Sequence, residues 1–402
     1  MNEYSLQNEW KGKTIRFMTA QTISLFGSSL VQYAIIWYIT LSTSSGMMMT
    51  ISTACGFVPQ ILISLFAGVW IDRYDRKHMC MLSDAVIAVS TFILALLFLS
   101  GYRSVWLLFL VLLIRSAGTG IQTPAVNALI PQLVPAEHLM KINGINSTIN
   151  SLMMFLSPAV SGAILSVTSI EAAFFLDVIT AAIGIGIMFT IAVPPLRSKD
   201  EQGSQVKESV IQEMRYGFRY LKDQRFIRNL LVFQITVLIL ISPSAFLTPL
   251  MVSRTFGAQV WRLTFSEMTF SAGAAAGGLL IAAWGGFRSR MRTTVLAGFL
   301  YGILMIGLGV SPVYPAYLVC NFLIGVTMPC YNAPINVLIQ EKADPAMHGR
   351  IFSFMQITNA CALPFGMLVF GPLADVTRIQ NLLIFGGTAV LCCTLYTGKK
   401  IA

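Results

Sequence analysis

The sequence predicts an all-α integral membrane protein with twelve transmembrane helices, arranged as two six-helix pseudo-symmetric repeats. Composition predicts the membrane class: 55% of the 402 residues are hydrophobic and only 11% are charged, whereas a soluble domain carries about 25% charged residues. Spacing predicts the helices, because apolar runs long enough to cross a bilayer, about 20 residues, recur along the whole chain. Similarity between the two halves predicts the repeat.

The apolar runs fall into two blocks of six on either side of a polar stretch. Residues 1–193 form the first predicted bundle, 194–225 a cytoplasmic linker, and 226–402 the second bundle. The first apolar run is too long for a signal-peptide core, so we expect a retained helix. The expected helices span 16–41, 47–71, 79–100, 104–125, 141–167, 172–193, 227–250, 264–286, 293–310, 315–340, 351–373 and 380–397.

Part of the linker has its own helical period. Val210, Met214, Phe218 and Leu221 recur at spacings of four, four and three, while basic residues take the other faces. This pattern is typical of an amphipathic helix that lies on an anionic membrane surface. Packing against the cytoplasmic helix ends is the alternative, and the two are compatible.

Lysine and arginine fix the expected orientation. With the amino terminus inside, 22 of the 27 basic residues fall on the inner side, four fall outside, and Arg115 lies within a helix. Because basic residues accumulate on the cytoplasmic side, both termini are expected in the cytoplasm. Membrane insertion thereby explains the net charge of +10, and a nucleic-acid partner is not expected.

The halves match at a nearly constant offset. Asn127-Ala-Leu-Ile130 corresponds to Asn336-Val-Leu-Ile339 at 209 residues, and the same offset relates Asn150 to Asn359. Two parallel six-helix repeats place a pseudo-two-fold axis along the membrane normal, with a central site where the halves meet.

A short charged hinge joins the second and third predicted helices. It contains Gly68, Asp72, Arg73, Arg76 and Lys77. These residues can lock the helix ends together as a gate or hold an anionic head group. A simpler interpretation is a basic loop that only fixes orientation.

Charged residues inside the membrane mark the expected coupling site. Arg115 lies near mid-bilayer, where an arginine costs roughly 2.5–3.5 kcal/mol on insertion scales and needs a partner or a wet cavity. Asp177 and Glu267 are the acidic candidates for binding a proton. We assign Asp84, near the inner end of its helix, to the hinge cluster.

Polar and aromatic side chains on helix faces predict the wall of a substrate cavity. They form stripes along the first, fifth and tenth helices, and abundant methionine adds an adaptable apolar surface. Packing between helices through polar residues competes with this interpretation at about half of the positions. The cavity candidates are Gln21, Ser28, Gln32, Tyr33, Asn150, Met154, Tyr331, Asn332 and Asn336.

No enzymatic chemistry is expected. Gly12-Lys13-Thr14 resembles the end of a phosphate-binding loop, but Gln7 stands where its first glycine is required. No nucleophile–base constellation is visible, and neither the cysteines nor the three histidines have metal-ligand spacing, so no cofactor and no metal are expected.

Several motifs resemble those of the major facilitator superfamily. Gly68-x3-Asp72-Arg73-x2-Arg76-Lys77 resembles its signature between helices two and three. Arg115-x2-Gly118-x-Gly120 resembles its fourth-helix motif, and Ser157-Pro158-x2-Ser161-Gly162 is similar to the fifth-helix motif of its antiporters. The stretch from Ile114 to Asn127 resembles the bacterial macrolide-efflux branch of drug:proton antiporters.

The chain departs from the family pattern at several positions. Asp75 replaces the second hinge glycine, and Ser157 and Ser161 replace glycines of the fifth-helix motif. The first helix has no acidic residue within the membrane, although some proton-coupled exporters use one there.

The resemblance implies a secondary active transporter in the bacterial cytoplasmic membrane. It implies export of a bulky amphiphilic, macrolide-like drug in exchange for protons, by alternating access, with the monomer in the lipid bilayer as the functional unit. One alternative is a major facilitator that exports an endogenous metabolite such as a siderophore or peptide. A non-transporting membrane receptor or assembly factor on the same scaffold is the other.

Overall fold

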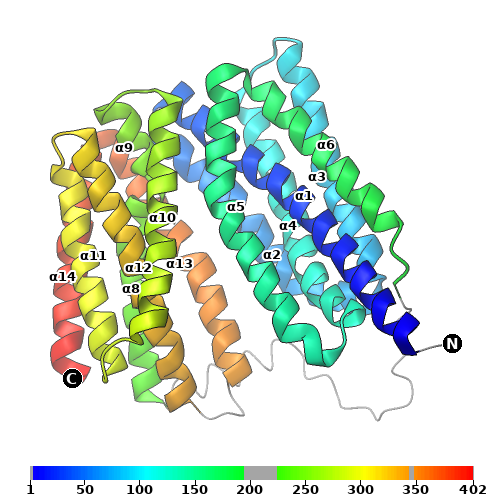
Figure 1. Cartoon of the computed structure of the whole chain (residues 1–402). Coiled ribbons are helices and arrows are strands. Elements are labelled where there is room, and N and C mark those ends of the chain that lie inside the picture. The colour runs from blue at the N-terminus through cyan, green and yellow to red at the C-terminus, as the bar shows by residue number, and fades with distance from the viewer. Residues whose placement is uncertain (1–2, 194–223, 344–347, 402) are drawn as a thin grey trace. The chain divides into compact units, whose positions relative to one another are not determined.

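The computed structural model describes residues 3–193, 224–343 and 348–401, and regular structure in these ranges is helical throughout (Figure 1). Twelve helical segments are long and apolar enough to cross a membrane. The contacts divide the chain into two compact units, one of residues 1–42 and 51–199 and the other of 43–50 and 200–402. The predicted amphipathic helix of the linker lies outside the described residues.

Unit 1 is a bundle of six long helices. α3 packs against both α4 and α6, so one side of α3 is buried in the bundle while its other side is exposed. The helices continue past the apolar runs: α4 ends at Leu133 rather than near residue 125, since its last two turns remain apolar enough to pack. The helices are α1 (Glu3–Thr43), α2 (Gly46–Arg73), α3 (Arg76–Leu99), α4 (Val105–Leu133), α5 (Leu139–Val167) and α6 (Ile170–Phe189), with a short η1 (Ala136–His138) before α5.

Close approach of α1 and α6 depends on Gly27. A Cβ atom at this position would lie 1.9 Å from the Oγ1 of Thr180 and 3.1 Å from the Cα of Asp177. Only glycine fits this contact between helices. Gly27 thereby brings its neighbour Ser28 within reach of α6.

A serine of α4 interrupts the backbone ladder of α2. The Oγ of Ser116 donates to the carbonyl of Gly56 at 2.7 Å and accepts from the backbone N–H of Gln60 at 3.0 Å. An unbroken α-helix joins these two backbone groups directly. Pro59 lies between them and cannot donate to the ladder, so Ser116 stabilises a local opening of α2.

The described part of unit 2 contains seven helices. The sequence predicts one helix over 227–250, but the structure contains two that meet at Leu247, after Pro243 has weakened the ladder. α12 packs against α10 and α11, and α11 packs against α14. The helices are α8 (Arg225–Phe246), α9 (Thr248–Thr255), α10 (Val260–Trp284), α11 (Arg290–Val310), α12 (Tyr314–Lys342), α13 (His348–Val376) and α14 (Ile379–Ile401).

Backbone contact between α10 and α12 requires glycines on both helices. A Cβ atom on Gly273 would lie 2.0 Å from the carbonyl oxygen of Phe322, and one on Gly325 would lie 2.3 Å from that of Phe270. The two helices therefore pack at their smallest residues, as membrane helices commonly do.

Residues 43–50 belong to unit 2, and Asp375 at the end of α13 holds them there. Its carboxylate accepts hydrogen bonds from the backbone N–H groups of Gly46 and Met47 at 2.7 and 2.9 Å, and from Ser45 Oγ at 2.8 Å. The Nη2 of Arg254 lies 3.0 Å from the same carboxylate. A carboxylate beside free N–H groups at the start of a helix is favourable for both.

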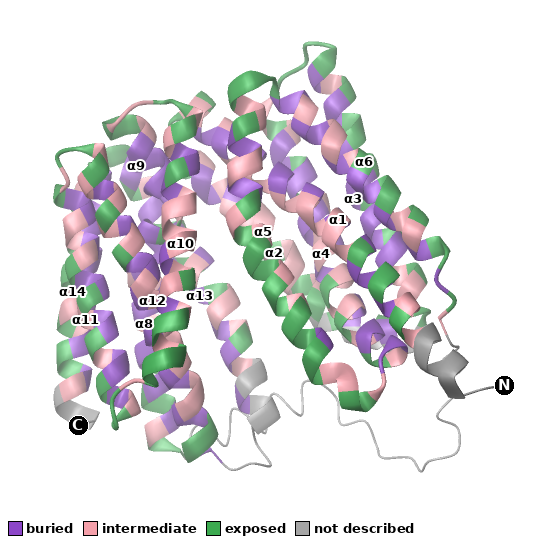
Figure 2. Cartoon of the chain, in the orientation of Figure 1, coloured by how far each residue is buried: buried purple, intermediate pink, exposed green. Residues whose placement is uncertain are grey.

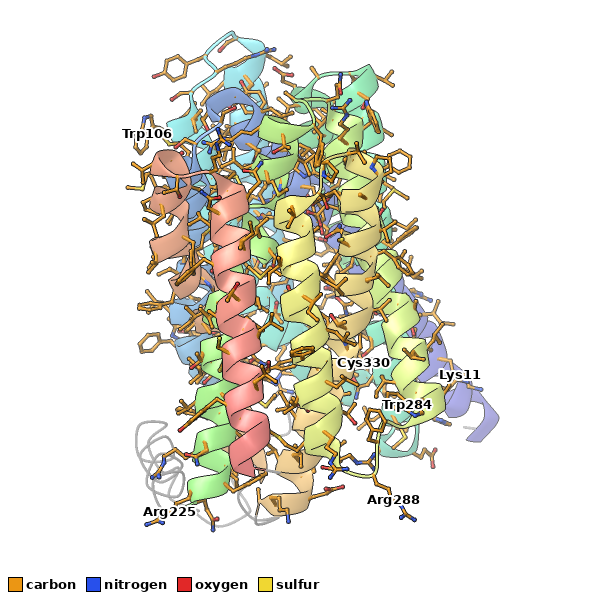
Figure 3. The ribbon with its side chains drawn as sticks, turned by 90° about the vertical axis from the view of Figure 1, so that its left-hand side faces the viewer. Lys11, Trp106, Arg225, Trp284, Arg288 and Cys330 are labelled. Atoms are coloured by element: carbon orange, nitrogen blue, oxygen red, sulfur yellow. The ribbon has the colours of Figure 1, made fainter. Side chains whose placement is uncertain are left out.

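Burial differs between the helices of each unit. α3 alternates buried and exposed residues, whereas the first half of α5 is mostly exposed (Figure 2). In unit 2, Arg225 at the start of α8 and Arg288 between α10 and α11 lie at the same end, with Trp284 beside Arg288 (Figure 3). Both arginines belong to connections that the charge pattern assigns to the inner side.

Candidate functional site

Arg115 and Asp177 form a buried ion pair within unit 1. The guanidinium Nη1 donates to Asp177 Oδ2 and, at 2.6 Å, to the Oγ1 of Thr91 on α3, while Nη2 donates to the carbonyl of Ser28 at 3.0 Å. Only 5% of the Arg115 side chain and 1% of the Asp177 side chain are exposed. The structure thus brings together two of the predicted coupling residues, and Arg115 has the partner that its depth requires.

The other oxygen of Asp177 also has a donor. The Oγ of Ser28 lies 3.3 Å from Asp177 Oδ1, at the point where Gly27 brings α1 close to α6. A guanidinium and a hydroxyl are therefore both directed at the Asp177 side chain, one at each oxygen.

Asp84 occupies a second buried site, and its assignment to the hinge cluster is wrong. The Oγ of Ser24 donates to Asp84 Oδ1 at 3.1 Å, and the Nε2 of Gln122 donates to the same oxygen. α3 begins at Arg76, so Asp84 is about two turns into the helix and away from the hinge. Its side chain is buried in the bundle.

The two carboxylates occupy parallel positions in two neighbouring hydrogen-bonded sets, which together make up one buried polar cluster. Ser24 and Ser28 are one turn apart on α1, and each donates to a different aspartate. We define the buried network as Ser24, Ser28, Asp84, Thr91, Arg115, Gln122 and Asp177, from α1, α3, α4 and α6.

A polar cavity adjoins this network inside unit 1. It has a volume of about 130 Å³ and is lined from α1, α4 and α5. The predicted residues Gln21 and Asn150 are in its wall, and the buried Nε2 of Gln21 has no hydrogen-bond partner among the described residues. Gln122 also lines this cavity, so it connects the cavity to Asp84.

Other predicted cavity residues lie apart from this cavity. Ser28 is engaged with Asp177, Tyr33 packs its ring on Trp37 at 5.8 Å between centroids, and Met154 is 56% exposed on α5. Gln32 is partly buried on α1, as are Asn332 and Asn336 on α12 of unit 2.

Tyr331 lies in the core of unit 2. Its side chain is 3% exposed, its ring packs against Phe233, and its carbons lie 3.4–3.5 Å from the point where a Cβ on Gly298 would be. Such packing is typical of a core aromatic side chain.

Glu267 lies in unit 2, partly buried on α10. Within the described residues it forms no ion pair, and its neighbour Ser266 bonds the hydroxyl of Tyr317 at 2.8 Å.

The hinge supports the helix ends at one end of unit 1. Arg76 Nη1 donates to the carbonyl of Ala128 at 2.8 Å, and Lys77 Nζ donates to the carbonyl of Ile191 at 2.8 Å. Asp75 accepts from the backbone N–H groups of Lys77 and His78 and thereby caps α3. The side chains of the predicted gate residues Asp72 and Arg73 lie outside what the structure describes, as does the surrounding of Gly68.

Gln122 and Thr91 were not predicted as site residues, although the sequence contains a signal that points to them. Gln122 and Thr91 have no charge, and polar residues inside helices commonly serve packing. However, Asp84 and Thr91 are seven residues apart and therefore share a face of α3. That face points toward the α4 side chains Gln122 and Arg115.

Relatives of known name match nearly the whole chain. Macrolide efflux protein A of Streptococcus pyogenes is 30% identical over 390 residues, which cover 96% of each chain. Multidrug efflux pump Tap of Mycobacterium bovis is 21% identical over 397 residues, covering 97% of this chain and 94% of the pump.

Solved transporters share the fold. A POT family transporter in complex with a thioalcohol conjugated peptide has a TM-score of 0.71 at 15% identity, covering 98% of this chain and 97% of that one. A D-xylose-proton symporter has a TM-score of 0.69 at 14% identity, covering 95% and 96%.

The family description that matches this sequence extends from residue 17 to residue 367. Together with twelve apolar helices and full-length similarity to efflux proteins, it shows a multi-pass bacterial membrane transporter and not an enzyme. The chain belongs to the Major Facilitator Superfamily.

Proposed function

We propose that this transporter exports bulky amphiphilic compounds of the macrolide type in exchange for protons, by alternating access. Similarity to Macrolide efflux protein A carries the proposal, because 30% identity extends over 96% of both chains rather than over one shared motif. The transporter acts as a monomer in the bacterial cytoplasmic membrane. Both termini lie inside, as the bias of basic residues toward one side favours.

The chemistry of unit 1 supports proton coupling. A buried arginine paired with an aspartate is costly in a membrane and typically serves transport or proton movement. The polar cavity beside it offers amide groups to the polar parts of a substrate. Arg115 and Asp177 act in coupling, while Arg76 and Lys77 with Asp72 control the inner gate.

Accumulation of labelled erythromycin in pump-deficient bacteria tests this function. Cells that express the chain should accumulate less drug than vector-only cells. A protonophore should raise accumulation to the vector level. Asp72→Asn and Arg115→Ala should each abolish export, whereas Arg378→Ala, at an exposed position, should export normally.

Two results would overturn parts of this proposal. If accumulation equals that of vector-only cells while the protein is present in the membrane, macrolides are not the substrate, and endogenous metabolites become the class to test. If export persists when the proton gradient has been removed, proton exchange is refuted.

A further inference from the structure

We propose that Asp84 is a proton-binding site of unit 1 and that Gln122 couples its protonation to the polar cavity. The inference rests on the proton-coupled export proposed above and names the group that binds the proton. Asp177 and Glu267 are the acidic candidates that the sequence suggests, and Asp84 replaces them in this role.

Asp84 is buried without a cation. Its exposed fraction is 3%, and within the described residues it forms no ion pair. Both of its hydrogen bonds come from uncharged groups, Ser24 Oγ and Gln122 Nε2, and both end on Oδ1. An uncompensated buried carboxylate costs several kcal/mol, and binding a proton removes most of that cost.

Asp177 provides the contrast within the same bundle. It is equally buried, but the guanidinium of Arg115 neutralises it. Two carboxyl groups in such different surroundings take different protonation states, and this difference identifies their roles. Asp177 keeps Arg115 in place as a carboxylate, whereas Asp84 is the group that can exchange a proton.

Among the described residues of α1, α3, α4 and α6, no cation forms an ion pair with Asp84. α4 has one charged residue, Arg115, which is held by Asp177, and α6 has Asp177 and Glu171, the latter paired with Arg103 at 2.6 Å. α1 has no charged residue after Arg16, and on α3 the neighbouring titratable group is the Cys80 thiol.

Gln122 connects Asp84 to the cavity. The cavity wall contains five side-chain amides, at Gln21, Gln122, Asn127, Asn146 and Asn150. While Nε2 of Gln122 donates to Asp84, its amide oxygen is the atom that remains for a ligand, and it accepts from a substrate hydroxyl or ammonium group.

Protonation of Asp84 reverses the hydrogen-bonding group that Gln122 presents to the cavity, from an acceptor to a donor. When water in the cavity transfers a proton to Oδ2 of Asp84, the new O–H donates to the Gln122 amide oxygen, and the amide turns its NH₂ group toward the cavity. A hydrogen-bond donor of the substrate then faces the NH₂ donor of Gln122, so the hydrogen bond is lost and the substrate is released. Loss of the proton to water restores the first arrangement, so substrate and proton exclude each other, as antiport requires.

Infrared difference spectroscopy of purified protein tests the proton site without any substrate. Between acidic and alkaline buffer, the wild type should lose the C=O band of a protonated carboxylic acid. Asp84→Asn should lack this band. Glu267→Gln and Asp177→Asn should retain it, and Gln122→Leu should shift the pH at which it disappears.

Proton release on drug addition tests the coupling. In weakly buffered solution, erythromycin should release about one proton per wild-type molecule bound, and none from Asp84→Asn or Gln122→Leu that still bind the drug. By linkage, lowering the pH should weaken erythromycin binding to the wild type by the same factor as the drug shifts proton binding, and should leave Asp84→Asn unaffected.

The outcomes separate the two proposals. If the band persists in Asp84→Asn or never titrates in the wild type, Asp84 is not the proton site, whatever the drug result. If the band belongs to Asp84 but erythromycin neither binds nor is exported, the site stands and the macrolide substrate is wrong. Proton release by Gln122→Leu equal to wild type would refute coupling through Gln122.

Discussion

Arg115 and Asp177 neutralise each other across α4 and α6, with Thr91 and Ser28 completing their hydrogen bonds. Each charge is tolerated inside unit 1 because of the other. Removing one partner leaves the second uncompensated, which costs about 3–5 kcal/mol, whereas replacing both with apolar residues is often neutral.

This pair predicts different results for stability and for transport. Arg115→Met and Asp177→Leu should each lower the unfolding temperature in detergent, and the double variant Arg115→Met/Asp177→Leu should recover most of the loss. Drug export should stay at the vector level in all three. Export by the double variant at normal membrane level would show that the pair serves the fold alone.

Asp375 predicts a loss of stability within unit 2 when its carboxylate is removed. Asp375→Ala deprives Ser45, Gly46 and Met47 of an acceptor and Arg254 of its counter-ion, so a loss of about 2 kcal/mol is expected. The unfolding temperature measures it. Thr377→Ala is the control, since its exposed hydroxyl bonds only the carbonyl of Leu373 in its own helix, and equal shifts would contradict the prediction.

The close contact at Gly273 predicts that forcing α10 and α12 apart lowers the stability of the protein. Gly273→Ala places a methyl group 2.0 Å from a backbone oxygen, so the helices must move apart, at about 1–3 kcal/mol. Gly278→Ala, five residues on in the same helix, meets no atom within 4 Å and should be neutral or stabilising. Thermal unfolding of the two purified variants makes the comparison. Similar unfolding temperatures would show that the contact yields easily.

Asp75 predicts a capping effect at the start of α3. Asp75→Ala removes the acceptor for Lys77 and His78 N–H and should cost about 1 kcal/mol, Asp75→Gly only a few tenths, and Asp75→Asn almost nothing. Urea or thermal unfolding distinguishes these values. If Asp75→Ala matches Asp75→Asn, the cap contributes no stability, and the replacement of the family glycine needs another explanation.

The main lines of the fold follow from the sequence because bilayer thickness fixes helix length. Twelve apolar runs correspond to twelve spans, and their ends differ by a few residues because helices such as α4 extend beyond the apolar run. The division at Leu247 was not predicted, since Pro243 within a helix is compatible with a simple kink.

The candidate site was only partly predictable. The depth of Arg115 required a partner or a wet cavity, and the sequence left Asp177 and Glu267 as acidic candidates without choosing between them. The structure pairs Arg115 with Asp177. Asp84 was misassigned because its distance from the hinge along the chain says nothing about the direction of its side chain. Tyr331, a cavity candidate from the sequence, lies in the core of unit 2. A pattern of polar and aromatic residues along a helix does not show which face of that helix packs against its neighbours.

The buried network lies wholly in one half of a duplicated chain. At the offset of 209 residues that relates the halves, Arg115 corresponds to Ile324 and Asp177 to Gly386, neither of which can carry charge. The hydrogen bonds that hold the Arg115 and Asp177 charges therefore lie wholly within unit 1, and the matching positions of the second half supply no charge that could take their place.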